Sequence, residues 1–308
     1  MAKVHFPRIS GNQYVDHFYH FDQGIRATTG DVFFVSSVTG TNSTGYGRSP
    51  ESPFASVDYC MGQITSANAD RVYAMPGHTE TLTAAGSSLG NGGVFIGSVL
   101  SNGVSIIGIG EGRDRPTFNY TTASAASMNI AAANVTLENL VFTPNGFSAI
   151  TAAINLTGAD FTMRNCEMQI STGTNACVLG ILTAATAARM KILNCNFVGP
   201  ATSTQTCTAA IKHEVGIDYL IRGCTIKGKL TSAILNATAV LGGNIDQNIM
   251  VVTTNDAIIM HASSTPFITN NRMNVSGGTA PITAAAGFVA GNVYSAAAGV
   301  TAGTAVTI

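Results

Sequence analysis

Seven short segments between residues 134 and 295 repeat one pattern, and this repeat limits the possible folds of the chain more than any other feature. Each segment has an apolar residue two positions before a central Asn, Gly or Gln, and a second apolar residue three positions after it. The central residues are spaced 21 to 29 positions apart, and they are Asn139, Asn165, Asn194, Gly223, Gln247, Asn270 and Gly291. A period of this length, built from short strands with tight turns, is typical of a solenoid.

The central residue of each segment is interpreted as a corner between two strands. Asn and Gly tolerate the left-handed backbone that such a corner requires. Additional apolar runs between the corners, such as SAITAAINL and DAIIMH, indicate a further strand in each coil. A leucine-rich repeat would need its own Leu pattern and a helical segment in every unit, and neither is visible. The sequence therefore predicts an all-β fold: a right-handed, single-stranded parallel β-helix, a solenoid of about ten coils.

Two parts of the chain are distinguished by their composition. Residues 31–308 are predicted to form the β-helix domain, with regular coils at about 104–295. A short capping helix at about 56–65, which Pro53 and Ser56 begin, is expected to cover the N-terminal end, because an open strand edge invites aggregation. Residues 1–30 show neither a strand nor a helix period and are predicted to form an extended N-terminal docking arm. Its interface candidates are Phe6, Tyr14, His17, Phe18, Tyr19, His20 and Phe21.

The residue that follows each corner forms a second series, which is interpreted as a structural ladder. The ladder consists of Cys166, Cys195, Cys224, Asn248, Asn271 and Asn292. Stacked cysteines would be small buried hydrophobes, and stacked asparagines could pass hydrogen bonds from coil to coil. A metal site is disfavoured because ligands must converge on one point, whereas ladder positions form a line. Disulfides between rungs are disfavoured by the geometry of neighbouring strands. Cys177 and Cys207 are predicted to form a second stack.

Charged residues also recur in register with the corners. Asp160, Arg189 and Asp218 each lie five residues before a corner, and Glu138 and Arg164 each lie one residue before a corner. The interpretation is charge compensation on a solvated face. The alternative is a glycosidase in which Asp160 and Asp218, roughly 9–10 Å apart over two coils, act as the carboxylate pair. Arg189 between them would keep both carboxylates ionised, which is unsuited to a general acid.

No set of catalytic residues is recognised in the sequence. There is no G-x-S-x-G, Walker-type glycine loop or serine–histidine–aspartate arrangement. His78 and His213 are isolated and are predicted to be turn or surface residues. Asp16, His17, His20 and Asp22 have a spacing that could bind a metal, but an interface is favoured there. The predictions are therefore no enzymatic activity, no catalytic residue, no cofactor and no metal.

Charge and hydropathy exclude several kinds of partner. The net charge of −1 gives no electrostatic case for nucleic acid or an anionic membrane. The N-terminus, MAKVHFPRIS, lacks the apolar region of a signal peptide, and no apolar run reaches the roughly 18 residues of a membrane span. Residues 273–308 contain no charged side chain. Because an uncharged surface is a poor solvent face for a monomer, a homo-oligomer is predicted.

Three runs near the N-terminus carry a resemblance to a known family. The runs DVFFVSSVTGTNSTGYGRSPESPFASVDYC, ADRVYAMPGHTETL and GVSIIGIGEGRDRPTFNY resemble the first segment of pectate-lyase-like β-helix proteins of tailed-phage virions. The resemblance covers residues 31–120 by motif and the remainder by repeat. It implies a virion location on the capsid surface after assembly in the host cytoplasm, and similar proteins suggest a trimer. Pectate lyases bind calcium through clustered aspartates and use an arginine base; the sequence has no such cluster, so no catalytic residue is transferred.

Two functional hypotheses follow. The favoured one is a structural virion protein of a tailed bacteriophage that decorates and stabilises the capsid. The arm would anchor it to the major capsid protein or other virion proteins, and the uncharged C-terminal third would pack against sister chains. The alternative is a tailspike-like polysaccharide-binding or depolymerising protein, which would need a groove with aromatic and acidic side chains. A cellular β-helix adhesin is a third, less favoured reading.

Overall fold

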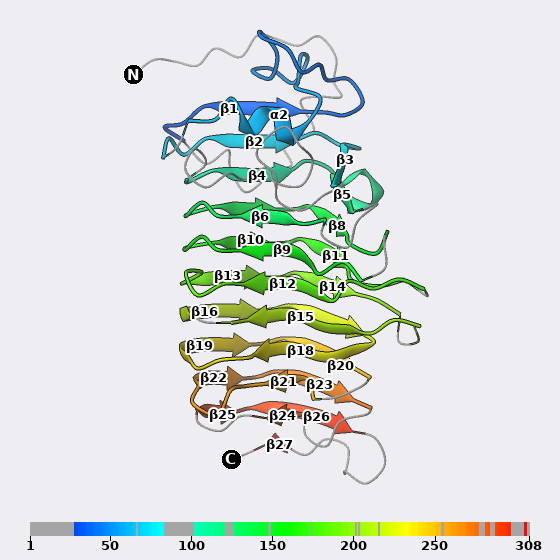
Figure 1. Ribbon diagram of the computed structural model, residues 1–308, viewed down its shortest axis with the longest axis vertical. Helices are drawn as coiled ribbons and strands as arrows, with labels where there is room; N and C mark the ends of the chain where they lie inside the picture. Colours follow the sequence, from blue (N-terminus) through cyan, green and yellow to red (C-terminus); the bar gives the residue numbers. More distant parts are fainter. Residues whose placement is uncertain are drawn as a thin grey trace.

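Three sheets run side by side along the molecule, and the computed structural model shows their strands stacked as successive coils of an elongated β-helix (Figure 1). The predicted fold class, an all-β parallel β-helix, is confirmed. The structure describes residues 28–65, 67–82, 102–120, 126–146, 149–172, 174–200, 202, 204–214, 216–253, 256–276, 281–283, 287–296 and 305–306.

We number the three sheets in the order in which the chain passes through them within a regular coil. Sheet I has ten strands: β1 (Val32–Val35), β2 (Arg71–Ala74), β4 (Ser105–Gly108), β7 (Thr136–Glu138), β10 (Thr162–Arg164), β13 (Met190–Leu193), β16 (Gly216–Arg222), β19 (Val240–Asp246), β22 (Thr265–Thr269) and β25 (Phe288–Ala290). Sheet II has ten strands: β3 (Thr79–Leu82), β5 (Thr117–Tyr120), β8 (Val141–Thr143), β11 (Glu167–Gln169), β14 (Asn196–Val198), β17 (Thr225–Gly228), β20 (Ile249–Val252), β23 (Arg272–Val275), β26 (Asn292–Ala296) and β27 (Ala305–Val306). Sheet III has seven strands: β6 (Met128–Ile130), β9 (Ala152–Leu156), β12 (Leu179–Thr183), β15 (Cys207–His213), β18 (Leu230–Asn236), β21 (Ile258–Ile259) and β24 (Ile282–Thr283).

The seven predicted corners join sheet I to sheet II. All of them have a left-handed backbone, with φ between 52° and 66°. Five are not glycine, and Asn is the side chain that best tolerates this conformation. The apolar residues two positions before the corners are buried, and they pair from coil to coil, as Leu137 does with Met163 and Met163 with Ile192.

A second set of left-handed residues lies before the strands of sheet I or, in β16 and β19, within their first half, and the sequence pattern did not reveal it as a corner. Its members have φ between 55° and 73°, and they are Asn134, Asp160, Arg189, Asp218 and Gly242. Three of these are the residues in which only an alternation of charge was recognised. Their side chains follow one another along the axis because each occupies the same bend of its coil.

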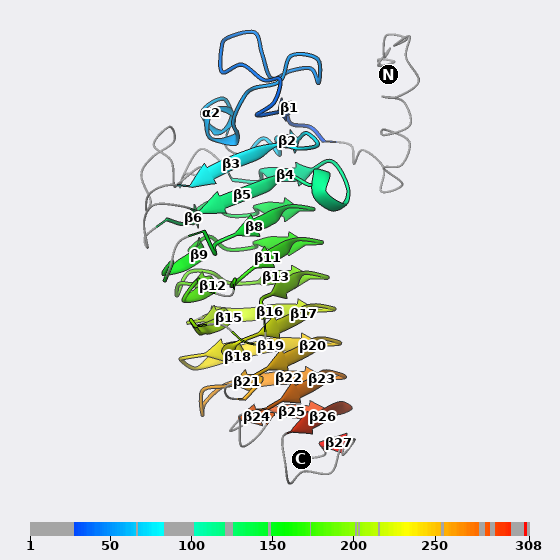
Figure 2. The ribbon, with the colours of Figure 1, turned by 90° about the vertical axis from the view of Figure 1, so that its right-hand side faces the viewer.

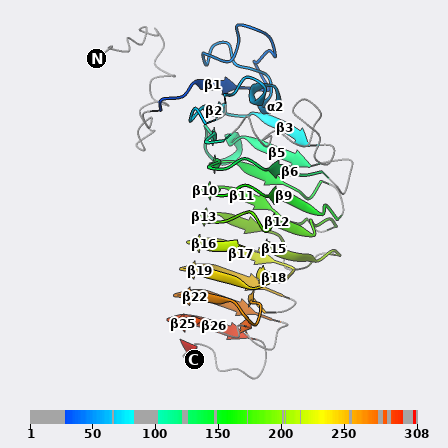
Figure 3. The same ribbon diagram turned by 60° about the vertical axis from the view of Figure 1, so that its left-hand side comes forward.

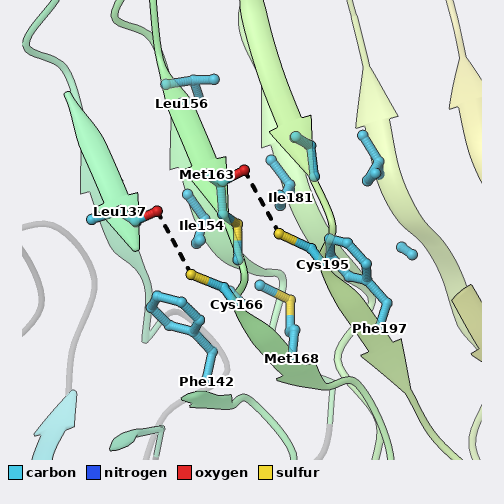
Figure 4. Packing of buried hydrophobic residues seen from close by; sticks show 14 of the residues in the cluster. Leu137, Phe142, Ile154, Leu156, Met163, Cys166, Met168, Ile181, Cys195 and Phe197 are labelled. Carbon is cyan, nitrogen blue, oxygen red and sulfur yellow. Dashed lines mark hydrogen bonds between the residues drawn. The ribbon is translucent and has the colours of Figure 1, made fainter. Parts of the chain in front are cut away.

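The residues after the corners form a continuous hydrogen-bonded ladder inside the β-helix. The sulfur atoms of Cys166 and Cys195 lie 3.7 Å from the carbonyl oxygens of Leu137 and Met163 in the preceding coil (Figure 4). They lie 3.3 Å from the carbonyl oxygens of Arg164 and Leu193 in their own coil, so each thiol proton is shared between two acceptors. The amide of Asn271 donates to the equivalent carbonyl, that of Ile245, at 2.9 Å. Cysteine and asparagine therefore satisfy the same buried acceptor in successive coils.

The asparagine part of the ladder makes a second link that the thiols do not make. The Asn248 Oδ1 accepts from the backbone N–H of Cys224 at 2.8 Å, and the Asn271 Oδ1 accepts from that of Asn248 at 3.0 Å. The Asn292 Oδ1 continues the series by accepting from the backbone N–H of Asn271 at 2.9 Å. Each asparagine is thus joined to the coil before it through both its donor and its acceptor.

The N-terminal end carries the short helix α2 (Val57–Met61), which lies beside β1 (Figure 1). It is shorter than the helix expected at about 56–65. The Ser56 hydroxyl accepts from the backbone N–H of Tyr59, and the Glu80 carboxylate accepts from those of Val57 and Asp58, so the helix N-terminus is capped twice. A single 3₁₀ turn, η1 (Gly112–Asp114), follows β4.

Two histidines that were predicted to be turn or surface residues are buried, so that prediction was wrong. His78 is fully buried, where its Nδ1 accepts from the backbone N–H of Ser37 at 3.0 Å. His213 lies inside the β-helix, 2.7 Å from the Thr183 Oγ1, with its ring 4.8 Å from that of Tyr219. A lone histidine in sequence carries no signal of burial, because a single hydrogen-bond partner from another coil is enough to accommodate it.

The predicted arm lies almost wholly outside the described residues. Its interface candidates Phe6, Tyr14, His17, Phe18, Tyr19, His20 and Phe21 all fall there, as do Asp16 and Asp22. No helix in the described part of the chain is long and apolar enough to cross a membrane.

Replacing a ladder asparagine should destabilise the protein more than replacing a ladder cysteine. In Asn271→Ala the Asn248 N–H and the Ile245 carbonyl lose buried partners, so the free energy of unfolding should fall by about 3 kcal/mol. Cys195→Ala removes only a weak donor and should cost about 1 kcal/mol. Guanidinium unfolding of both variants measures the difference, and equal losses would show that the double link adds nothing.

Acid should destabilise the protein through His213. Burial lowers the pKa of this imidazole to about 4, whereas in the unfolded chain it is near 6.5. Between those values the unfolded state binds a proton that the folded state does not. Stability is therefore lost as the pH falls from about 6.5 to about 4, by up to about 3 kcal/mol. Unfolding of the wild type and of His213→Gln across this range should give curves that converge at low pH, and parallel curves would contradict the assignment.

Candidate functional site

The outer face of sheet I, with the corners that precede its strands, carries a series of charged side chains on successive coils. We call this series the charged strip, and it consists of Glu138, Asp160, Arg164, Arg189, Lys191, Asp218, Arg222 and Asp246. The strands that bear it, β7 to β19, follow one another along one edge of the molecule (Figure 3). Stacking in register places equivalent side chains one coil apart, at about 4.8 Å.

Ion pairs between adjacent coils hold the two ends of the strip. Glu138 on β7 pairs with Arg164 on β10 at 2.5 Å, as the sequence predicted. At the other end, Arg222 on β16 lies 3.3 Å from the Asp246 carboxylate on β19. In both pairs the carboxylate is the less exposed partner, with 14% of its side-chain surface accessible. The guanidinium groups are therefore fixed in orientation while keeping part of their surface in solvent.

Asp160 and Arg189 form the most complete contact of the strip. The Arg189 Nε and the second guanidinium nitrogen each lie 2.6 Å from a different oxygen of Asp160. This bidentate hydrogen bond lowers the pKa of Asp160 and raises that of Arg189. Asp218 raises the pKa of Arg189 only through its charge, and among the described residues it forms no ion pair with Arg189.

The strip has the alternating charges that the sequence predicted, but its contacts are uneven. Asp160 is bound by two hydrogen bonds, whereas Asp218 on the other side of Arg189 interacts at longer range. Because its pKa is lowered, Asp160 is ionised near neutral pH and can accept a proton but not supply one. Asp160 is therefore unsuited to be the general acid of a glycosidase pair with Asp218.

Lys191 occupies the middle of the strip on β13. It is exposed, with Thr162 and Leu220 as its neighbours in the adjacent strands. Within the described part of the chain its ammonium group makes no hydrogen bond or ion pair, in contrast to the arginines on either side. It is therefore the cation of the strip that is available to a ligand without first giving up a partner.

Uncharged polar side chains extend the strip around the corner. The Gln247 Oε1 accepts from the Arg222 guanidinium at 3.2 Å. The Asp246 Oδ1 accepts from the Thr269 hydroxyl at 2.8 Å and from the Asn270 amide at 3.0 Å. This network was not predicted, although its members stand at a corner or directly before one. A search for polar residues flanking each corner would have found it.

The six ladder residues Cys166, Cys195, Cys224, Asn248, Asn271 and Asn292 lie inside the β-helix and do not reach the strip. The cysteines are free thiols, and Cys177 and Cys207 lie with their sulfur atoms 3.8 Å apart. Among the described residues, no group of three or more His, Cys, Asp or Glu side chains is placed to hold a metal ion.

Comparison with known proteins gives similarity of fold. No protein-family model matches the chain, and no curated protein sequence matches it. Among solved structures, pectate lyase Pel9A superposes with a TM-score of 0.52 at 10% identity, covering 85% of this chain and 79% of that one. A rhamnogalacturonan lyase gives 0.37 at 11% identity over 81% and 73%, and the ORF18 protein of Geobacillus virus E2 gives 0.32 at 10% over 78% and 57%. The chain thus has a pectate-lyase-like parallel β-helix.

The prediction that the protein has no enzymatic activity is overturned by this comparison. A solved structure that shares its fold over most of its length is a pectate lyase. The missing aspartate cluster argues only against one arrangement of catalytic groups. The charged strip was interpreted as charge compensation, and it presents carboxylate, guanidinium and ammonium groups on one face.

The exposed pair of the strip should contribute little to stability. Arg189 is 54% exposed and Asp160 33% exposed, so Arg189→Ala should lower the free energy of unfolding only slightly. Arg164→Ala should cost more, because it leaves the Glu138 carboxylate largely buried without its partner. Chemical unfolding of the two variants tests this order, and a larger loss for Arg189→Ala would show that the exposed pair is a structural element.

Proposed function

We propose that the protein binds a polysaccharide along the outer face of sheet I, with the charged strip as the binding surface. The observation that carries the proposal is the recurrence of paired donors and acceptors at the period of the coils. A linear polymer presents its chemical groups at regular intervals. A solenoid likewise presents equivalent side chains at regular intervals along an extended surface. The shared fold with a pectate lyase supports the proposal without identifying the polysaccharide.

The chemistry of the strip suits the hydroxyl groups of a sugar. Hydroxyl groups both donate and accept hydrogen bonds, and the strip presents guanidinium and ammonium donors beside carboxylate acceptors. The ion pairs hold Arg189 and Arg222 in place before a ligand arrives, which lowers the conformational entropy lost on binding. Its four cations and four anions balance, so hydrogen bonding rather than net charge would select the ligand.

Cleavage of the bound polymer belongs to the same proposal. Acid–base cleavage needs one group that accepts a proton and another that donates one. The ionised Asp160 carboxylate can accept a proton, and the Lys191 ammonium group, close enough to lower the pKa of Asp160 by its charge, can donate one. These two residues are the first to test for depolymerising activity.

Binding should depend on the exposed cations of the strip. The double variant Lys191→Ala/Arg222→Ala should raise the dissociation constant for a bound polysaccharide more than about tenfold, since each lost charged hydrogen bond costs about 1.5–3 kcal/mol. Lys227→Ala is the matched control, because Lys227 is an exposed lysine on sheet II in the same coil as Arg222. The measurement is calorimetric titration with a panel of neutral and acidic bacterial surface polysaccharides, together with an assay for newly formed chain ends.

The proposal is wrong if no polysaccharide of the panel binds, or if the double variant binds as tightly as Lys227→Ala. New chain ends that form with the wild type and not with Asp160→Asn would extend binding to depolymerisation. Unchanged cleavage by Asp160→Asn would exclude this carboxylate from the reaction.

A structural role in a tailed-phage virion is the second candidate function. It is supported by the resemblance of residues 31–120 to β-helix proteins of tailed-phage virions and by the aromatic and histidine-rich composition of residues 1–30. In this role the protein would decorate the capsid surface, held there by the arm. The two roles are compatible, because the arm and the charged strip belong to different parts of the chain.

Deleting residues 1–27 should abolish attachment to the capsid while leaving the β-helix folded. The deletion ends before Thr28, whose hydroxyl donates to the Ala69 carbonyl at 2.6 Å. Co-sedimentation with purified phage particles measures attachment, and circular dichroism checks the fold. Full occupancy of the particles by the shortened chain would rule out anchoring by the arm.

A further inference from the structure

The last coils of the β-helix expose apolar side chains on two of their faces. On sheet I, Leu241, Phe267 and Phe288 are 57%, 54% and 57% exposed. On sheet II, Ile249 and Val293 are each 46% exposed. Of the large hydrophobic side chains that are exposed in the described part of the chain, only Val38 and Tyr46 lie elsewhere. Such a concentration of apolar surface marks an interaction site more often than a free surface.

On sheet I, two of the exposed apolar side chains project side by side from adjacent strands. Phe267 on β22 and Phe288 on β25 are partners in adjacent strands, and their ring centroids lie 6.1 Å apart. Both side chains point outward, since the residues that follow them, Ile268 and Val289, are buried. We call this pair the phenylalanine ridge.

On sheet II the surface is hollowed. An open depression of about 240 Å³ crosses β20, β23 and β26. Its rim is formed by outward residues of three paired strands, with Ile249 and Val293 on either side of Arg272. The half-buried Tyr294 also lines it. We call this depression the sheet II hollow.

The ridge and the hollow belong to the same coils and lie on two sides of one corner. In β22 and β23, for example, Phe267 precedes the corner residue Asn270 and Arg272 follows it. The strands of the two faces meet along this corner, where β22 and β25 run beside β23 and β26 (Figure 2). One chain therefore carries a projecting apolar pair and an open recess, lined by apolar side chains and by Arg272, that face in different directions.

We propose that the phenylalanine ridge of one copy packs into the sheet II hollow of the next, so that the protein assembles as a ring. A two-fold dimer could pair ridge with hollow twice only if both lay on one face, whereas here they lie on two sides of a corner, in sheets I and II. A heterologous contact between ridge and hollow covers both surfaces, and it closes only with three or more copies.

The charges near the contact favour a second copy of this chain as the occupant. Residues 273–308 contain no charged residue, and residues 230–272 contain only Asp246, Asp256 and Arg272. Asp246 is already bound to Arg222, and Arg272 is the single cation of the hollow. Two such surfaces can approach without like-charge repulsion, and burial of the four exposed apolar side chains of the ridge and the hollow drives the association.

The oligomeric state in solution tests this inference, measured by size-exclusion chromatography with light scattering. The wild type should have at least three times the mass of one 31.7 kDa chain. Phe288→Asp disrupts the ridge and Ile249→Asp disrupts the hollow, and each variant alone should have the mass of a single chain. Val38→Asp is the matched control, because Val38 is 72% exposed near the N-terminal end and lies outside the contact. Circular dichroism shows that each variant is folded.

An equimolar mixture of the two variants distinguishes a heterologous contact from a symmetric one. The Ile249→Asp chain retains its ridge and the Phe288→Asp chain retains its hollow, so the mixture should give a species of two chains and nothing larger. A wild type that is monomeric or dimeric, a single variant that keeps the wild-type mass, or a mixture that stays monomeric would each overturn the proposal. These outcomes are independent of polysaccharide binding, because neither variant alters the charged strip.

Discussion

Six successive coils of this β-helix, from that of Cys166 to that of Asn292, each make an equivalent buried contact with the coil before. The side chain that follows the corner donates to a carbonyl oxygen of the preceding coil, whether it is the thiol of Cys195 or the amide of Asn271. This contact sits beside the left-handed corner, where strand pairing is interrupted and a backbone acceptor would otherwise be left without a donor. It fixes the register between coils, and the register in turn decides which side chains are stacked on the outer faces.

The charged strip depends directly on that register. Glu138 meets Arg164, and Arg222 meets Asp246, because their positions before the corner are equivalent in adjacent coils. A slip of one residue in a strand would exchange its outward and inward side chains. The surface chemistry of sheet I is therefore a consequence of contacts made in the interior, and the strip needs no separate scaffold.

The sequence was sufficient to predict the fold class, the seven corners and the ladder positions, because a solenoid repeats its local environment. Asn139 and Asn165 show the same spacing to their apolar neighbours, and that periodicity survives variation in the loops. Contacts that occur once could not be predicted in this way. His213 finds its partner Thr183 in another coil, and the capping of α2 by Glu80 joins residues more than twenty positions apart. The candidate site could be predicted only in part. The alternation of charge is visible in the sequence. The unequal contacts of Arg189 with its two aspartates, and the ammonium group of Lys191 without an ion-pair partner in the described part of the chain, depend on side-chain geometry.

The strand β27 hinders the extension of sheet II by a further parallel strand. β27 pairs with β26 in the antiparallel sense, whereas the other strand pairs of the three sheets are parallel. A further parallel coil from another molecule would find this edge of sheet II already occupied by a strand of the opposite direction. End-to-end polymerisation, in which one solenoid extends the sheets of the next, is therefore hindered at this edge. The proposed ring avoids this edge, because its contacts lie on the sides of the solenoid.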